Sequence, residues 1–84
     1  MDWTENDNKL TKEFVFDDFG QAWAFMTEVA MLAERKNHHP EWTNVWNRVM
    51  VSLTSHDEGN VITEKDRKMA EGIDRIFERY LYRK

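Results

Sequence analysis

Hydrophobic and polar residues alternate over residues 9–16, and this pattern is typical of a β-strand. Successive side chains of an extended chain point to opposite faces, so Leu10, Phe14 and Phe16 share one face of the segment. Residues 3–5 predict a shorter strand before it. We therefore expect the chain to begin with two strands.

The apolar spacing changes to a helical period after Asp17 and Asp18, residues that are suited to cap a helix N-terminus. We predict that this helix runs to about Lys36. Its main apolar stripe consists of Phe19, Ala22, Trp23, Met26, Val29, Ala30 and Ala33. Phe25 and Leu32 form a second ridge outside this stripe. The ridge indicates either a subunit contact or a helix that lies deep in its own monomer.

Pro40 is predicted to end the helix, because proline lacks a backbone N–H and forces the preceding residue towards extended geometry. Strand patterns follow over residues 42–46 and 49–56. The pair Asn47 and Arg48 between them is a plausible two-residue hairpin turn. We therefore expect these two segments to pair as an antiparallel hairpin.

The last segment begins with Thr63-Glu-Lys-Asp66, which resembles a capping box with Asp in place of Glu. Apolar residues then recur at intervals of three and four through Leu81, as a helix that packs on a sheet requires. The element order is thus β-β-α-β-β-α. It predicts an α+β fold in which a four-stranded antiparallel sheet carries helices on one face.

Composition limits the class of protein. The 84 residues suffice for one small domain, residues 1–84. Twelve basic against 16 acidic residues give a net charge of −4, which argues against a nucleic-acid partner. The absence of cysteine excludes disulfides and thiolate metal ligands. The first ten residues contain no apolar stretch and no segment is long enough to span a membrane, so we expect a cytoplasmic protein without a signal peptide.

All three histidines lie in one short part of the chain. The predicted hairpin places His39 opposite His56 on the same face of the sheet. His38 and the carboxylate of Glu34 lie near the same corner, with Trp42 as a flat apolar neighbour. Imidazole has an unperturbed pKa near ~6.5 and can therefore give or take a proton at neutral pH. The cluster predicts a site for general acid and base chemistry.

Two other interpretations of the histidines stay open at this point. Metal binding by His38, His39 and His56 is possible, although no metal-ligand spacing supports it. Surface histidines without a role are equally compatible with the spacing alone. A serine hydrolase is improbable, because Ser52 and Ser55 are not accompanied by an oxyanion-hole sequence.

Three segments resemble one known family. They are Glu-Arg-Lys-Asn-His-His-Pro-Glu-Trp-Thr-Asn-Val-Trp-Asn over 34–47, Val-Ser-Leu-Thr-Ser-His over 51–56 and Thr-Glu-Lys-Asp over 63–66. Together they closely resemble the pterin-4a-carbinolamine dehydratase family, also known as the dimerisation cofactor of a hepatocyte nuclear factor. The resemblance extends over about residues 10–77.

The resemblance implies loss of water from a 4a-hydroxytetrahydropterin to give quinonoid dihydropterin, with no metal and no organic cofactor. The implied catalytic residues are His38, His39, His56 and Glu34. The predicted substrate-binding residues are Asn37, His38, His39, Pro40, Trp42, Ser55, His56, Asp57 and Asp66. For Asp66, helix capping is an adequate alternative. We expect His39 and His56 to flank the reacting centre while Glu34 orients His38.

The chain departs from the family pattern at three places. Asn37 stands where many members have Asp, Trp46 replaces a Tyr, and the loop after His56 is one residue longer than in the vertebrate pattern. The resemblance further implies a homo-oligomer, a dimer or tetramer in which sheets join edge to edge, and a functional link to an aromatic amino acid hydroxylase. Two alternatives are a non-catalytic interaction module that uses the Phe25 and Leu32 ridge, and an enzyme of molybdenum-cofactor-related pterin metabolism.

Overall fold

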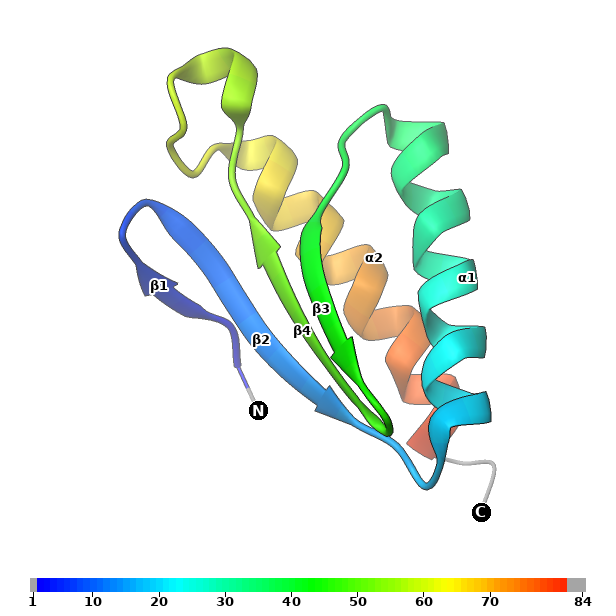
Figure 1. Ribbon diagram of the computed structural model, residues 1–84. Helices are drawn as coiled ribbons and strands as arrows, with labels where there is room; N and C mark the ends of the chain where they lie inside the picture. The colour runs from blue at the N-terminus through cyan, green and yellow to red at the C-terminus, as the bar shows by residue number, and fades with distance from the viewer. Residues whose placement is uncertain (1, 82–84) are drawn as a thin grey trace.

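An antiparallel sheet with two helices on one face makes up the computed structural model, which describes residues 2–81 (Figure 1). The elements in chain order are β1 (Thr4–Asn6), β2 (Lys9–Val15), α1 (Phe19–Lys36), β3 (Glu41–Val45), β4 (Arg48–Leu53), the 3₁₀ helix η1 (His56–Glu58) and α2 (Glu64–Leu81). The strand order is β1-β2-β4-β3. The predicted α+β architecture, β-β-α-β-β-α, is confirmed.

The central strands β2 and β4 supply the floor of the hydrophobic core. Phe14 lies opposite Val49 and Leu10 lies opposite Leu53, and all four side chains are buried beneath the helices. Phe14 also contacts the ring of Phe25 on α1, with a centroid separation of 4.9 Å. The alternation of apolar residues in the sequence therefore corresponds to the face of the sheet that the helices cover.

Both ends of α1 are set by capping residues. The Asp18 carboxylate accepts a hydrogen bond of 2.8 Å from the Gln21 N–H, as the sequence predicts. At the other end Asn37 has a φ of 51°, the left-handed conformation that asparagine tolerates well. The His38 N–H then donates to the Ala33 carbonyl at 3.0 Å. The helix thus ends at the Asn37 cap, before Pro40 can interrupt it.

Of the two interpretations of the Phe25 and Leu32 ridge, the structure confirms the helix that lies deep in its own monomer and contradicts the subunit contact. Both side chains are buried inside the monomer, because α1 packs against α2 as well as against the sheet. Phe25 lies 6.1 Å from the ring of Tyr80 on α2. Conversely Phe19 and Trp23, which the sequence placed in the main apolar stripe, are 48% and 58% exposed. A helix with two neighbours buries a wider sector than a single stripe predicts.

The hairpin that joins β3 and β4 differs in register from the prediction. Val45 pairs with Arg48, so the turn is Trp46-Asn47 and not Asn47-Arg48. The Asn44 side chain donates to the carbonyls of Trp46 and Arg48, at 3.2 and 2.9 Å, and holds this turn closed. The strand pairing ends at Leu53, so His56 does not belong to β4.

Helix α2 begins with the predicted capping box. The Asp66 carboxylate accepts a hydrogen bond of 2.9 Å from the Thr63 N–H, and Thr63 Oγ1 accepts one of 3.3 Å from the Lys65 N–H. Farther along, Gly72 lies against Leu32 of α1, which allows the two helices to approach closely. Within residues 2–81, no helix is long and apolar enough to cross a membrane.

Candidate active site

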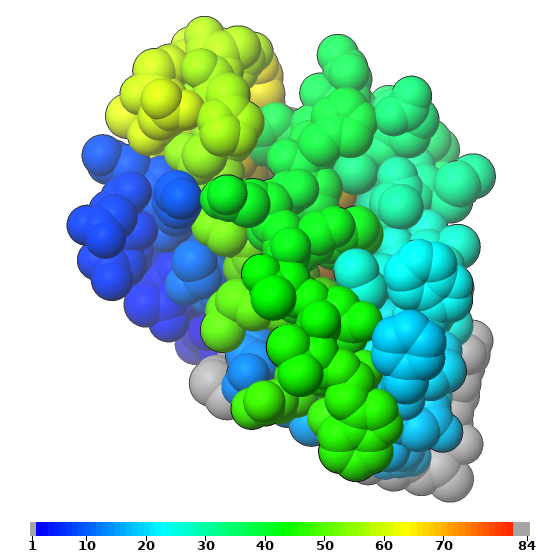
Figure 2. All heavy atoms as spheres, in the orientation of Figure 1, coloured from blue at the N-terminus to red at the C-terminus, as the bar shows by residue number. Residues whose placement is uncertain are grey.

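A polar hollow lies at one end of the sheet, between the α1–β3 connection and η1 (Figure 2). Its volume is about 270 Å³. The residues that line it are Asn37, His38, His39, His56 and Asp57. We call it the histidine hollow. Three imidazoles from two separate connections therefore surround one cavity, while the rigid sheet and helices lie beneath it.

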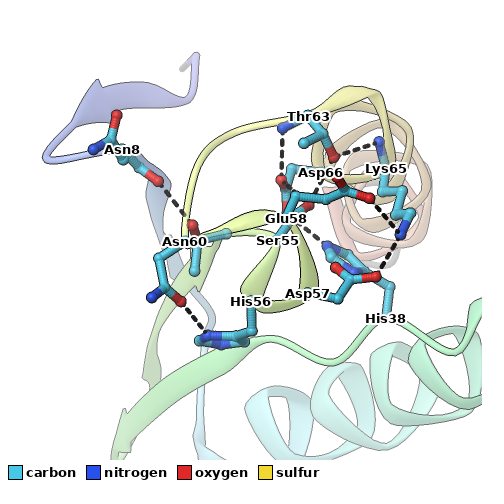
Figure 3. Close-up of polar contacts among 11 residues, drawn as sticks. Asn8, His38, Ser55, His56, Asp57, Glu58, Asn60, Thr63, Lys65 and Asp66 are labelled. Carbon is cyan, nitrogen blue, oxygen red and sulfur yellow. Dashed lines mark hydrogen bonds and ion pairs between the residues drawn. The ribbon is translucent and has the colours of Figure 1, made fainter.

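His38 is fixed by a buried carboxylate below the hollow (Figure 3). Its Nε2 lies 2.5 Å from Asp66 Oδ1, and the Asp66 side chain is completely buried. The other carboxylate oxygen accepts from Ser55 Oγ at 2.8 Å and from the Thr63 N–H. An ionised carboxylate can only accept, so Nε2 of His38 carries a proton and Nδ1 is left to exchange one.

Hydrogen bonds keep Asp66 ionised despite its burial. Burial alone raises the pKa of this carboxyl, but the hydrogen bonds from His38, Thr63 and Ser55 together lower the pKa below its ordinary value. A negative charge thus sits directly behind His38.

His56 is held by a side chain that the sequence analysis missed. Its Nδ1 lies 2.8 Å from Asn60 Oδ1 (Figure 3). Because the amide oxygen accepts, Nδ1 carries the proton and Nε2 is the nitrogen that can take one up. Asn60 has a φ of 62°, which turns the chain back towards His56. It lies in the loop after His56, which the resemblance to the family marks as one residue longer than the vertebrate pattern; nothing else in the sequence indicates its role.

An ion pair ties the η1 wall of the hollow to α2. Lys65 Nζ lies 2.7 Å from Asp57 Oδ2 and 3.7 Å from Glu58 Oε2. The hydrogen bond from Lys65 lowers the pKa of Asp57, and the same bond raises the pKa of Lys65. Lys65 gives no indication of this role in the sequence, because the contact depends on how η1 folds over the start of α2.

Two predicted contacts are wrong in detail. Glu34 does not orient His38: its carboxylate lies 3.0 Å from Nε2 of His39, and both side chains are exposed. His39 and His56 are not a cross-strand pair either, since neither belongs to a strand. They reach the same hollow because the connections that carry them leave the sheet at the same end.

The remaining predicted site residues do not line the histidine hollow. Ser55 and Asp66 lie beneath the hollow and support His38. Pro40 and Trp42 are not among the lining residues, and the half-buried Trp42 packs against the core. Among residues 2–81, no three histidine, aspartate or glutamate side chains are grouped so that they could hold a metal ion. Ser55 bonds to a hydroxyl and a carboxylate rather than to a histidine, which does not fit a hydrolase nucleophile.

Comparison with known proteins agrees with this fold and this set of side chains. The profile of the pterin 4 alpha carbinolamine dehydratase family matches residues 1–76. A protein of Rhizorhabdus wittichii that bears the provisional name pterin-4-alpha-carbinolamine dehydratase is 48% identical over 79 residues, which are 92% of this chain and 80% of that protein. A similarly named protein of Prochlorococcus marinus is 45% identical over 88% of this chain and 77% of its own length.

Two solved structures share the fold. The transcriptional coactivator/pterin dehydratase from Brucella melitensis has a TM-score of 0.84 and 45% identity, over 88% of this chain and 80% of that one. A pterin dehydratase-like protein described as a RuBisCO assembly factor in the alpha-carboxysome has a TM-score of 0.79 and 26% identity, over 92% and 90%. This chain belongs to the pterin-4-alpha-carbinolamine dehydratase family.

Proposed function

We propose that this protein is a hydro-lyase that converts a 4a-hydroxytetrahydropterin into quinonoid dihydropterin and water. The observation that carries the proposal is the histidine hollow, in which His38, His39 and His56 surround one cavity and two of them, His38 and His56, are hydrogen-bonded to Asp66 and Asn60. Membership of the dehydratase family supports it. We place the reaction in the recycling of tetrahydrobiopterin or a related pterin in the cytoplasm, beside an aromatic amino acid hydroxylase.

The reaction needs one proton donor and one proton acceptor. As the C4a–O bond breaks, a proton from an imidazolium joins the leaving hydroxyl, which departs as water. The lone pair of the adjacent ring nitrogen forms the new C=N bond, and a ring N–H gives its proton to a neutral imidazole. Proton transfer by two placed side chains contributes typically ~10²–10⁴ to a rate, so two histidines suffice without a metal or cofactor.

The hydrogen-bond partners distinguish the two roles. His38 donates its Nε2–H to the Asp66 carboxylate, which holds the ring in place and leaves Nδ1 to exchange a proton, so we assign His38 as the acid. His56 has only the neutral amide of Asn60, and its free Nε2 suits the base. Exposed His39, with Glu34 beside it, lies at the rim of the hollow and contacts the substrate. Asn37 and Asp57 complete the polar wall that binds the pterin ring.

We further propose that the protein acts as a homo-oligomer, with a dimer through β3 as the basic unit. β3 is an edge strand, and a second copy would pair with its free edge. The first turns of α1 and the β3–β4 turn lie side by side next to this edge (Figure 2). There Phe19 stacks on Trp23 at a centroid distance of 6.3 Å, and Trp46 is 64% exposed. Sedimentation of a Trp23→Glu variant as a monomer would support this arrangement.

Stopped-flow decay of a carbinolamine generated in situ tests the activity. The protein should accelerate the decay, and His38→Ala or His56→Ala should each lower that acceleration by roughly 10²-fold or more. Arg75→Gln, an exposed change on the outer part of α2, is the control and should leave it unchanged. If His56→Ala turns over like the wild type, our pairing of acid and base is wrong.

One comparison favours a second candidate, a non-catalytic assembly module. The structural neighbour with 26% identity is described as a RuBisCO assembly factor, so this fold also serves proteins in assembly. The same stopped-flow measurement separates the two. A module would bind pterin weakly or not at all and would leave carbinolamine decay at the uncatalysed rate.

A further inference from the structure

A second hollow adjoins the histidine hollow and is strongly basic. It measures about 180 Å³ and is lined by Lys36, His38, Lys65 and Lys68. We call it the basic cleft. Lys36 is the last residue of α1, and Lys65 and Lys68 lie in the first turns of α2. The two cavities share His38 as a lining residue, so they meet at this ring.

Within residues 2–81, two of the three ammonium groups have no carboxylate partner. Lys65 is paired with Asp57 and Glu58. Neither Lys36 nor Lys68 has an ion pair within the described range 2–81. The cleft therefore has two uncompensated positive charges, although the whole chain has a net charge of −4.

Helix stability does not explain this concentration of charge. A lysine at the C-terminus of a helix interacts favourably with the helix dipole, and this accounts for Lys36. Lys65 lies in the first turn of α2, where the helix dipole makes a positive charge unfavourable, and Lys68 adds a second positive charge in the next turn. Like charges placed around one cavity also repel each other. A bound anion relieves both penalties.

We propose that the basic cleft binds the phosphate group of a pterin substrate whose side chain is a phosphate monoester. This inference rests on the proposed function, since it names the class of pterin that enters the histidine hollow. A phosphate monoester carries a charge of about −1.5 to −2 at pH 7, which matches two unpaired ammonium groups better than a single carboxylate does. His38 would then lie between the reacting ring and the phosphate.

The test compares a 6-hydroxymethyl tetrahydropterin carbinolamine with its phosphate ester in stopped-flow decay. The variants are Lys36→Gln and Lys68→Gln, with Lys36→Arg and Lys68→Arg as charge-preserving counterparts and Arg75→Gln as the control for net charge. Lys65 is left in place because it holds Asp57. An exposed charge pair contributes about 1.4- to fivefold in affinity, so each Lys→Gln change should raise KM for the ester about threefold.

The expected results are specific to the ester. Its KM should lie roughly tenfold below that of the neutral substrate in the wild type, and the difference should shrink at about 0.5 M salt, where exposed charges are screened. The arginine variants and Arg75→Gln should retain the preference. Equal KM values for both substrates, or a preference that survives both Lys→Gln changes, would overturn the proposal and leave the dehydratase function intact.

Two further measurements distinguish failure of the basic-cleft proposal from failure of the proposed dehydratase function. If neither substrate is turned over, calorimetric binding of the stable oxidised pterin phosphate still tests the cleft: lysine-dependent binding supports the inference while the proposed function fails. Inorganic phosphate alone is the remaining probe. If it binds as tightly as the pterin phosphate, the cleft is a free-anion site and the substrate assignment is overturned.

Discussion

Asp66→Asn isolates the part of the site in which a buried charge controls a histidine. Asn has nearly the shape of Asp, and its amide oxygen can still accept from Ser55 and from the Thr63 N–H. Its NH₂ group must then face Nε2 of His38, where the carboxylate oxygen lay at 2.5 Å. Two N–H donors cannot bond, so His38 must move its proton to Nδ1 to keep the contact.

The magnitude follows from the bonds that change. A hydrogen bond to a charged group contributes about 1.5–3 kcal/mol, and the contacts of Ser55 and Thr63 weaken without being lost. We expect Asp66→Asn to lower the free energy of unfolding by about 2–3 kcal/mol at pH 7. The effect on turnover should be larger, roughly 10²–10⁴-fold, because the amide N–H that then faces Nε2 prevents His38 from holding a proton on both nitrogens, the form that donates to the leaving hydroxyl.

Three measurements on Asp66→Asn distinguish a loss of stability from a loss of proton transfer by His38. Urea unfolding gives the stability, stopped-flow decay gives turnover per folded molecule, and ¹⁵N shifts of the imidazole report the tautomer of His38. Asp74→Asn is the matched control: it removes a carboxylate that pairs with Lys12 at 2.9 Å on α2, away from the histidine hollow. It should reduce stability but not turnover. Full turnover by Asp66→Asn, with the tautomer changed, would refute the reasoning.

Three further outcomes are expected. Stability should decrease below about pH 4, because folding lowers the pKa of Asp66. The contribution of Asp66 to stability is therefore present above its unfolded pKa of about 3.9 and is lost as the pH falls through the folded pKa. Urea unfolding should show a smaller decrease in Asp66→Asn. Gly72→Ala should lower stability by about 1 kcal/mol, since the added Cβ would lie 2.7 Å from Leu32 Cδ2. A raised Tm would contradict this, and so would a Gly72→Ala cost that is no smaller in the Leu32→Ala background than in the wild type. Asn60→Ala should lower turnover about tenfold by freeing the His56 tautomer, with the ¹⁵N imidazole shifts as the check.

Local chemistry determined most of the fold in advance. The alternation over β2, the Asp18 cap and the Thr63 to Asp66 capping box depend on residues within a few positions of one another, and each is present. The predicted register of the β3–β4 hairpin was wrong for a local reason that turn propensities do not capture. The Asn44 side chain bonds across the turn and favours Trp46 at a positive φ, an unusual conformation for a bulky residue.

The amino-acid sequence by itself determined which side chains are available for proton transfer and which segments are strands and helices, because periodicity and capping act over short distances. It did not determine the partners of the histidines. Asp66 lies 28 residues from His38 and is brought to it by the packing of α2 beside the end of α1, whereas nearby Glu34 bonds to His39 instead. Which nitrogen holds a proton, and which lysines surround an anion, are properties of chain segments that meet only after folding.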